Sequence, residues 1–258
     1  ARQQQPVALG IEQVTSAAQS LLRMLDRTNG GFGGAPKFPQ PAFIEFLLDV
    51  RDSAGDDATR AAVDEAVRLT LDRMACGGVN DQIGGGFHRY SVDEKWLLPH
   101  FEKMLYDNAQ LGAIYSRAAR TYRDAFYERV ARRTLDYVLR EMTSPDGGFF
   151  SAQDAEVDGR EGANYVWIEE EVRAAVDPAD AGFAMQVYGL SEGFNFRDPH
   201  YPELPPTNVL RLGARPERLA EQMGLSEAEF MAKLDRINAR LYQARSARKQ
   251  PRLDDKIL

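Results

Sequence analysis

Three Gly-Gly-Phe segments recur along this chain, and their spacing constrains the fold more than any other feature. They begin at Gly30, Gly85 and Gly147, at intervals of about 60 residues, with amphipathic helical patterns between them. A period of this length accommodates one hairpin of two helices. The glycines permit a sharp turn with positive φ, and the phenylalanine can fill the turn from the core side. The recurrence therefore predicts a repeat of helical hairpins arranged as a toroid.

Apolar residues at helical spacing place helices on both sides of these segments. The predicted helical faces lie within residues 11–25, 43–50, 63–74, 101–115, 131–142 and 230–241. Pro41 suits the first turn of the second helix, and Ser226 with Glu229 forms a capping box before the last one. The fold class is thus all-α, an (α/α)6-type toroid of helical hairpins.

Short β pieces are expected at the rim of this toroid, at residues 149–151 and 164–167. The Pro-rich stretch 193–216 is expected to be an irregular excursion. Each Gly-Gly-Phe segment follows one helix and precedes the N-terminus of the next, so the three segments should share one rim. Unpaired N–H groups and positive helix ends gather there, which suits an anionic or polyhydroxylated ligand.

The composition is that of a folded chain with negative net charge. Of 258 residues, 43% are hydrophobic, and the net charge is −7. This charge argues against a nucleic-acid surface, and no apolar run is long enough for a membrane span. The single Cys76 excludes an internal disulfide and suits a reducing cytoplasm. We therefore expect a cytoplasmic protein that uses no cofactor or metal and binds neither nucleic acid nor membrane.

Candidate chemistry is concentrated between Asn80 and Asn108. Two of the three histidines of the chain, His88 and His100, lie in this stretch, and histidine suits proton transfer near neutral pH. If the stretch after Pro99 is helical, His100, Lys103 and Asp107 share one side of the helix. A solvated polar face with local ion pairs is the competing interpretation for Lys103 and Asp107.

Several further residues have two interpretations each. Tyr90 and Trp96 could stack on a sugar ring or anchor the core. Asp154 and Glu156 begin a pattern typical of a calcium loop, but its twelfth position is Tyr165 rather than Glu. A solvated acidic turn is therefore the better interpretation, with no metal site.

Four long motifs in the right order resemble one family. They are Gly30–Pro39, Asp81–Asp93, Pro99–Asn108 and Gly147–Glu156. Together they are similar to the thioredoxin-fused six-hairpin family of spermatogenesis-associated protein 20-like proteins. The helical part of that family resembles N-acylglucosamine 2-epimerases, which fold as an (α/α)6 toroid with the site in its mouth. The stretch from Tyr106 to Ala109 resembles a Tyr-Asp-x-Ala helix of those epimerases.

The resemblance also implies a longer protein. Members of the family carry an N-terminal thioredoxin-like domain and further hairpins. Six hairpins need on the order of 350 residues, so this chain accommodates about four. We therefore expect residues 1–258 to form a single helical-hairpin domain and an incomplete ring. An open ring leaves an apolar seam that favours a homodimer, and the thioredoxin-like domain of the same protein is an expected partner.

The resemblance implies acid–base chemistry on a carbohydrate. Epimerisation next to a carbonyl needs a base and an acid on opposite faces of the substrate carbon, and a group that polarises the oxygen. The predicted catalytic residues are His88, His100, Asp81 and Glu102. The predicted substrate-binding residues are Lys37, Arg89, Tyr90, Trp96, Lys103, Asp107, Asp154 and Glu156.

Two other functions remain open. A glycoside hydrolase would use two facing carboxylates, drawn from Asp81, Glu102, Asp154 and Glu156. A non-catalytic module would serve as a scaffold for the thioredoxin-like domain, in redox chemistry or protein quality control. A prenyltransferase-type toroid is disfavoured because its zinc site needs Asp, Cys and His at a spacing that this sequence lacks.

Overall fold

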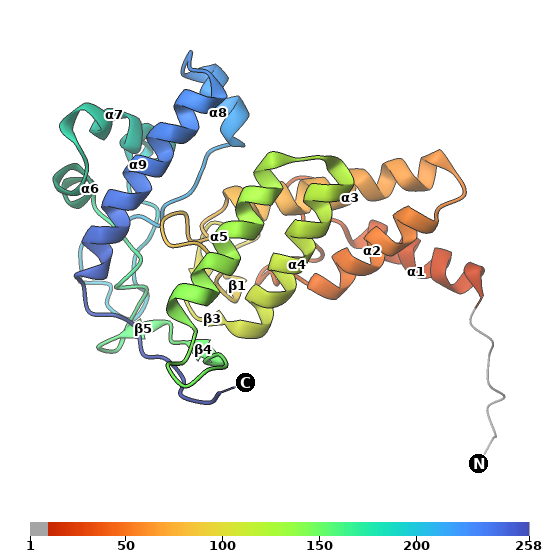
Figure 1. The fold of residues 1–258 in the computed structure, drawn as a ribbon, viewed down its shortest axis with the longest axis horizontal. Helices are drawn as coiled ribbons and strands as arrows, with labels where there is room; N and C mark the ends of the chain where they lie inside the picture. Colours follow the sequence, from red (N-terminus) through yellow and green to blue (C-terminus); the bar gives the residue numbers. More distant parts are fainter. Residues whose placement is uncertain (1–9, 258) are drawn as a thin grey trace.

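Helical hairpins joined by a layer of loops make up the computed structural model, which describes residues 10–257 (Figure 1). The first five helices are α1 (Ile11–Met24), α2 (Pro41–Ser53), α3 (Asp57–Cys76), α4 (Leu105–Tyr122) and α5 (Ala125–Glu141). The later ones are α6 (Glu169–Ala175), α7 (Pro178–Val187), α8 (Pro216–Gln222) and α9 (Glu227–Ser246), with a single 3-10 turn, Leu190–Glu192, after α7. Helix α2 packs against α3, and α4 packs against α5. The predicted class, all-α with helical hairpins, is confirmed.

The helix ends follow from local sequence signals. Pro41 is the first residue of α2, where its missing N–H costs nothing. The Ser226 hydroxyl accepts from the Glu229 amide, and the Glu229 carboxylate accepts from the Ser226 amide, so the predicted capping box is present at α9. Asp56 caps α3 in the same way by accepting from the amide of Thr59.

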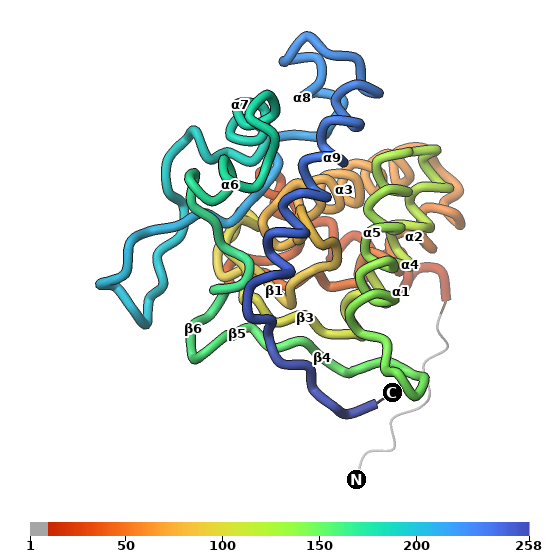
Figure 2. Tube along the Cα trace, turned by 60° about the vertical axis from the view of Figure 1, so that its left-hand side comes forward, coloured from red at the N-terminus to blue at the C-terminus, as the bar shows by residue number. Residues whose placement is uncertain are grey.

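In the described part of the chain, six strands of two residues each lie in the loop layer. They pair antiparallel as β1 (Tyr90–Ser91) with β2 (Pro99–His100), β3 (Lys103–Met104) with β4 (Ala152–Gln153), and β5 (Glu156–Val157) with β6 (Arg160–Glu161). Backbone bridges join Lys37 to Ser91, Lys103 to Gln153, and Gln153 to Leu253. The three loops that contain Gly-Gly-Phe are therefore linked side by side, and the C-terminal segment runs along β4 (Figure 2). The predicted common rim is confirmed.

The glycines of the first two segments are required by both conformation and space, whereas Gly147 is required by conformation alone. Both glycines of each segment have positive φ, from 71° at Gly30 to 91° at Gly147. A Cβ on Gly31 would lie 2.5 Å from the Trp96 ring, and one on Gly86 would lie 2.5 Å from the Tyr137 ring. Close packing and positive φ together leave glycine as the residue that fits.

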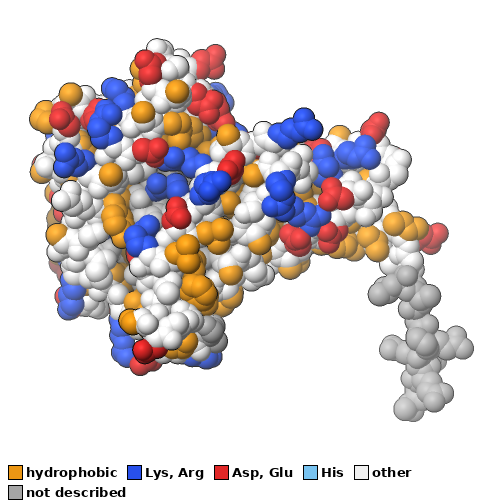
Figure 3. Space-filling view, viewed as in Figure 1, with side chains coloured by type: hydrophobic (Ala, Val, Ile, Leu, Met, Phe, Trp, Pro, Cys, Tyr) orange, Lys and Arg blue, Asp and Glu red, His pale blue; other side chains and the backbone are white. Residues whose placement is uncertain are grey.

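The helices form an open arc rather than a closed ring. In Figure 1 α1 and α9 lie at opposite ends of the molecule. Among the helices described, α1 fully buries only Ala18, and Ile11 is 70% exposed. Apolar side chains gather on the surface near α1, beside the more charged α2–α3 hairpin (Figure 3). The incomplete ring with an exposed seam is thus confirmed, and homodimer formation through the seam stays a prediction.

Three details differ from the sequence-based expectations. The stretch after Pro99 is extended, and the helix begins only at Leu105. Isolated bridges lie at Phe149 and Phe150 as expected, followed by strand β4, but the β piece expected at 164–167 is a turn with a single bridge at Trp167. Helices α6, α7 and α8 were not predicted. The Pro-rich stretch is irregular as expected. No helix of residues 10–257 is long and apolar enough to cross a membrane. A cytoplasmic location stays a prediction.

Candidate functional site

The segment from Pro99 to Met104 is extended, and its side chains alternate between two sides. Pro99, Phe101 and Lys103 are buried, whereas His100 and Glu102 are only half-buried. This is the alternation of a strand, in which successive side chains point to opposite faces. The helical interpretation, with His100 and Lys103 on one face, is therefore wrong: the two side chains belong to different surroundings.

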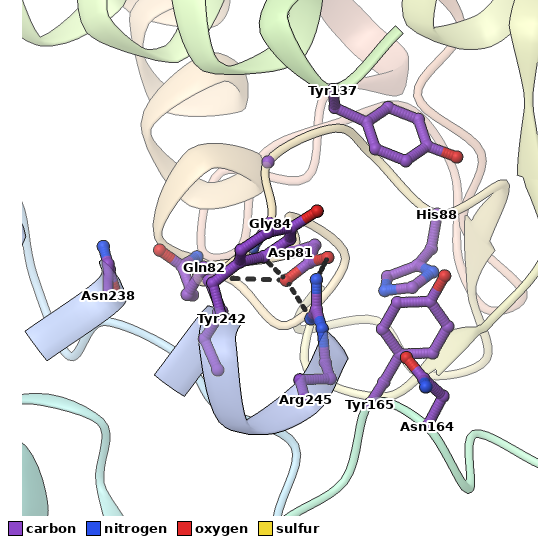
Figure 4. A network of polar contacts seen from close by, with 12 residues as sticks. Asp81, Gln82, Gly84, His88, Tyr137, Asn164, Tyr165, Asn238, Tyr242 and Arg245 are labelled. Carbon is purple, nitrogen blue, oxygen red and sulfur yellow. Dashed lines mark hydrogen bonds and ion pairs between the residues drawn. The ribbon is translucent and has the colours of Figure 1, made fainter. Parts of the chain in front are cut away.

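On the inner side, one carboxylate binds two cations. The Asp81 carboxylate accepts from Lys103 Nζ at 2.7 Å and from both terminal nitrogens of Arg245 at 2.8 Å. It also accepts from the amide of Gly84, and Lys103 donates a second bond to the Gly85 carbonyl. Figure 4 shows Arg245, on α9, facing the carboxylate. We call Asp81, Lys103 and Arg245 the buried ion cluster.

The charges of the buried ion cluster stabilise ionised Asp81. Burial alone would raise the pKa of Asp81, but Arg245 and Lys103 more than offset this and hold it well below its ordinary value. The pKa of Lys103 is lowered because burial and repulsion by Arg245 outweigh attraction to Asp81. The Tyr137 and Tyr165 rings lie 4.1 and 5.0 Å from Lys103 Nζ and share in stabilising its charge. These contacts hold the loop layer onto α9.

His88 lies beside the buried ion cluster and is 2% exposed. Its Nδ1 is 2.8 Å from the Phe101 carbonyl, and its ring packs edge-on against Phe101 and Tyr165. Burial lowers the pKa of His88 to about 3, so the ring is neutral at pH 7 and its Nδ1–H donates to the carbonyl. A cavity of about 20 Å³ next to it is large enough for one water molecule at most.

Lys37 and Trp96 lie in the interior of the first Gly-Gly-Phe loop. Lys37 Nζ donates to Asp26 at 2.7 Å and to the Gly30 carbonyl at 2.9 Å. The indole N–H of Trp96 donates to the Asn29 carbonyl, and the ring is fully buried. Its faces are therefore closed to a ligand in this structure, and Trp96 anchors the core. Catalytic or substrate-binding roles for these interior residues and for Asp81, His88 and Lys103 stay predictions.

On the outer side, a second polar group faces solvent. His100 Nδ1 lies 2.7 Å from Glu161 Oε1, and His100 Nε2 lies 3.8 Å from Glu102 Oε2. Arg89 donates to Glu102 at 2.7 Å, and the ring of Tyr90 stacks on the imidazole at 5.0 Å between centroids. We call these five residues the rim cluster. Their arrangement places one imidazole between two carboxylates.

The ionisation of the rim cluster follows from these contacts. The hydrogen bond to Glu161 raises the pKa of His100, against the opposing effect of burial. The same bond lowers the pKa of Glu161. Glu161 lies on β6, and its carboxylate also accepts from the Phe101 amide. It therefore fixes both the imidazole and the strand that carries it, which sets the tautomer of His100.

Asp107 lies in the first turn of α4, close to the rim cluster. It is 9% exposed, and its Oδ2 has no hydrogen-bond partner among residues 10–257. Burial raises the pKa of Asp107 to about 6, with Arg89 lowering it and Glu102 raising it. A carboxyl group with this pKa exchanges protons near neutral pH.

The other predicted residues, Asp154 and Glu156, lie outside the rim cluster. Asp154 is exposed and accepts from the amide of Glu156. Glu156 is exposed and opposes Glu161 in the β5–β6 pair. Glu161 was missed as a site residue, because its only signal was its place after the third Gly-Gly-Phe. No group of residues 10–257 is arranged to hold a metal ion.

Comparisons with known proteins agree with the motifs. No family model matches the chain. Spermatogenesis-associated protein 20 of Homo sapiens is 39% identical over 259 residues, which cover 93% of this chain and 33% of the relative. The Mus musculus protein is 38% identical over 279 residues, which cover 98% of this chain and 35% of the relative. A solved structure described as a sugar epimerase from a ruminal bacterium has a TM-score of 0.46 and 13% identity. The match covers 96% of this chain and 76% of that structure's chain.

These matches confirm the family resemblance. The chain is an open arc of helical hairpins with a polar rim. It is a homologue of spermatogenesis-associated protein 20, and it spans about a third of the length of the curated relatives it matches.

Proposed function

We propose that the rim cluster is the acid–base centre of a carbohydrate-active enzyme that epimerises or isomerises a sugar next to a carbonyl group. The observation that carries this proposal is the position of His100. Its imidazole is bound by Glu161 on one side, faces Glu102 on the other and remains 29% exposed. A histidine held by a carboxylate and open to solvent is suited to exchanging a proton with a small molecule.

The proposed reaction uses two proton-exchanging groups. His100 takes the proton from the carbon next to the carbonyl, and the bonding electrons move into an enediolate. Asp107, with a pKa of about 6, returns a proton to the opposite face of that carbon. The Arg89 guanidinium stabilises the negative charge that develops on the oxygen. Protons and charge balance, because one group gains the proton that the other loses.

Aromatic side chains next to the rim cluster favour a sugar as the substrate. The Phe38 ring lies 4.7 Å from Tyr90 and is 41% exposed. Tyr106, one residue before Asp107, is 45% exposed. Such rings can cover the apolar face of a sugar, while Glu102 and Glu161 accept hydrogen bonds from its hydroxyl groups.

The test measures proton exchange directly. The chain is incubated in D2O with a panel of N-acylhexosamines, and NMR detects deuterium at the carbon next to the carbonyl. His100→Gln and Glu102→Gln should abolish the exchange, whereas Glu203→Gln, at an exposed residue away from the rim cluster, should not. Absence of both exchange and calorimetric binding in the unaltered chain would reject the enzyme proposal.

The scaffold function is the second candidate. One observation supports it: several chemically active side chains of the motifs are used up in the interior, where Lys103 binds Asp81 and the buried His88 binds the Phe101 carbonyl. A module that docks a thioredoxin-like domain of the full-length protein would need no acid–base centre.

The hydrolase alternative needs two carboxylates that face the substrate directly, but His100 lies between Glu102 and Glu161. Incubation with disaccharides, with NMR detection of released monosaccharides, tests this alternative.

A further inference from the structure

A cleft of about 650 Å³ lies apart from the rim cluster and shares no residue with it. The C-terminal end of α3, the turn between β1 and β2, and the segment 211–218 form its walls. Its volume is within the range of small-molecule sites, which is about 300–1,000 Å³. The cleft is therefore large enough to hold an organic ligand of moderate size.

The cleft is rich in positive charge although the chain carries a net charge of −7. Its lining contains five cationic side chains and a single acidic one. They are Arg73, Lys95, Arg211, Arg215 and Arg218, and the acid is Asp72. Local excess charge of one sign in a concave surface concentrates ligands of the opposite sign.

Two of these cations are already neutralised. Arg215 binds Asp72 at 2.7 Å and also pairs with Asp124 and Glu217. Arg211 pairs with Glu192. These contacts hold the guanidinium groups in place at the wall, but they leave little net charge for a ligand.

Three cations have no such partner. Within residues 10–257, the ion pairs at the cleft wall involve Arg211 and Arg215 but not Arg73, Lys95 or Arg218. All three residues line the cleft and are exposed, so their charges are available to a ligand. Planar guanidinium groups bind phosphate oxygens in pairs, and lysine adds a point charge.

Apart from Asn29, the rest of the cleft is apolar or glycine and chemically inert. Leu69, Leu97 and Leu212 line it beside Cys76. Burial raises the pKa of the Cys76 thiol to about 12, so the thiol stays protonated and is not a nucleophile. The cleft thus combines uncompensated positive charge with apolar contact surface, which is the combination that an organic phosphate needs.

We propose that this cleft binds a phosphorylated small molecule. The phosphate dianion is held by Arg73, Lys95 and Arg218, and the organic part packs on the leucines. No bond is made or broken in this step. The proposal is independent of the chemistry at the rim cluster.

Calorimetry with three related probes tests the ligand class. Glucose 6-phosphate should bind most tightly, glucuronate at least tenfold more weakly, and glucose not measurably, because a dianion makes more charge-assisted bonds than a carboxylate. Raising the salt concentration should weaken binding of glucose 6-phosphate. Equal binding of glucuronate and glucose 6-phosphate, or binding of neither, would overturn the proposal.

Variants locate the site. Arg73→Gln and Arg218→Gln should each weaken glucose 6-phosphate binding about tenfold, since each removes one charge-assisted contact. Arg240→Gln removes the same charge from an exposed position on α9 and serves as the matched control. An equal loss in Arg240→Gln, or no loss in the two cleft variants, would mean that phosphate binds elsewhere. Thermal unfolding of each variant confirms that it remains folded.

Discussion

Replacing Asp81 with Asn tests whether the buried ion cluster holds the loop layer together. The Asp81 side chain is 3% exposed, Lys103 is fully buried, and Arg245 is 5% exposed. The substitution keeps the size of the side chain but removes the only negative charge of the cluster. Two cations then remain next to each other in the interior, with no counter-charge.

The expected loss of stability is large. Removing one partner of a buried ion pair costs about 3–5 kcal/mol, because the other charge is left uncompensated. Here one anion serves two cations, so we expect a loss of about 5 kcal/mol in the free energy of unfolding. Domains are typically stable by about 5–15 kcal/mol, so the variant should unfold at far lower urea concentration.

The assay is urea unfolding at pH 7, followed by circular dichroism. Asp158→Asn is the matched control, because Asp158 pairs with Lys249 where both side chains are exposed. That change should alter the free energy of unfolding by less than about 1 kcal/mol. Adding Lys103→Met to Asp81→Asn returns the cluster to its original net charge and should recover part of the loss.

The pH dependence provides an independent reading. The pKa of Asp81 is held well below 3.8 in the folded state. Its contribution to the free energy of unfolding is therefore fully present above the ordinary pKa. This contribution is lost as pH falls below that value towards the folded pKa. Wild type should lose stability more steeply than Asp81→Asn below about pH 4. If Asp81→Asn unfolds at the same urea concentration as wild type, the argument for a stabilising ionised cluster is refuted.

Three further predictions follow from single contacts. Glu161→Gln should lower the pKa of His100 towards 6.5 in an NMR titration, since the Glu161 bond is the main cause of its raised value. Gly162→Ala should lower the free energy of unfolding in urea by more than about 1 kcal/mol, because a Cβ at φ 72° would lie 2.4 Å from the Phe101 ring. Between about pH 4 and 6, the contribution of Asp107 to stability should fall as this carboxyl, with its raised pKa, ionises in the folded state, so the stability of wild type relative to Asp107→Asn should decrease in urea unfolding over this range.

The repeat and most long helices could be predicted from the sequence because their signals are local. Positive φ at Gly30 and Gly147, the first-turn proline of α2 and the capping box at Ser226 each depend on a few neighbouring residues. Helices α6 and α8 have only seven residues each, which is too short for a reliable apolar period. Local patterns thus predict the hairpins but not the short helices between them.

The candidate site was harder to predict because its partners are distant in sequence. Arg245 lies 164 residues from Asp81, and Glu161 lies 61 residues from His100. Nothing in a single sequence connects such pairs. Lys103 made the prediction harder still. Because this charged residue lies on the buried side of residues 99–104, the sequence does not show the alternation of apolar and polar residues that marks a strand.

The alternation in residues 99–104 explains how the stretch from Asn80 to Asn108 can hold two histidines with different surroundings. His88 donates from inside to the carbonyl of Phe101, the residue between His100 and Glu102. From the same inner side, Lys103 binds Asp81. These two contacts fix the strand on its buried face, and the strand in turn sets where His100 and Glu102 stand on the rim. We therefore expect His88 to position the rim cluster through the backbone, without any need for access to solvent.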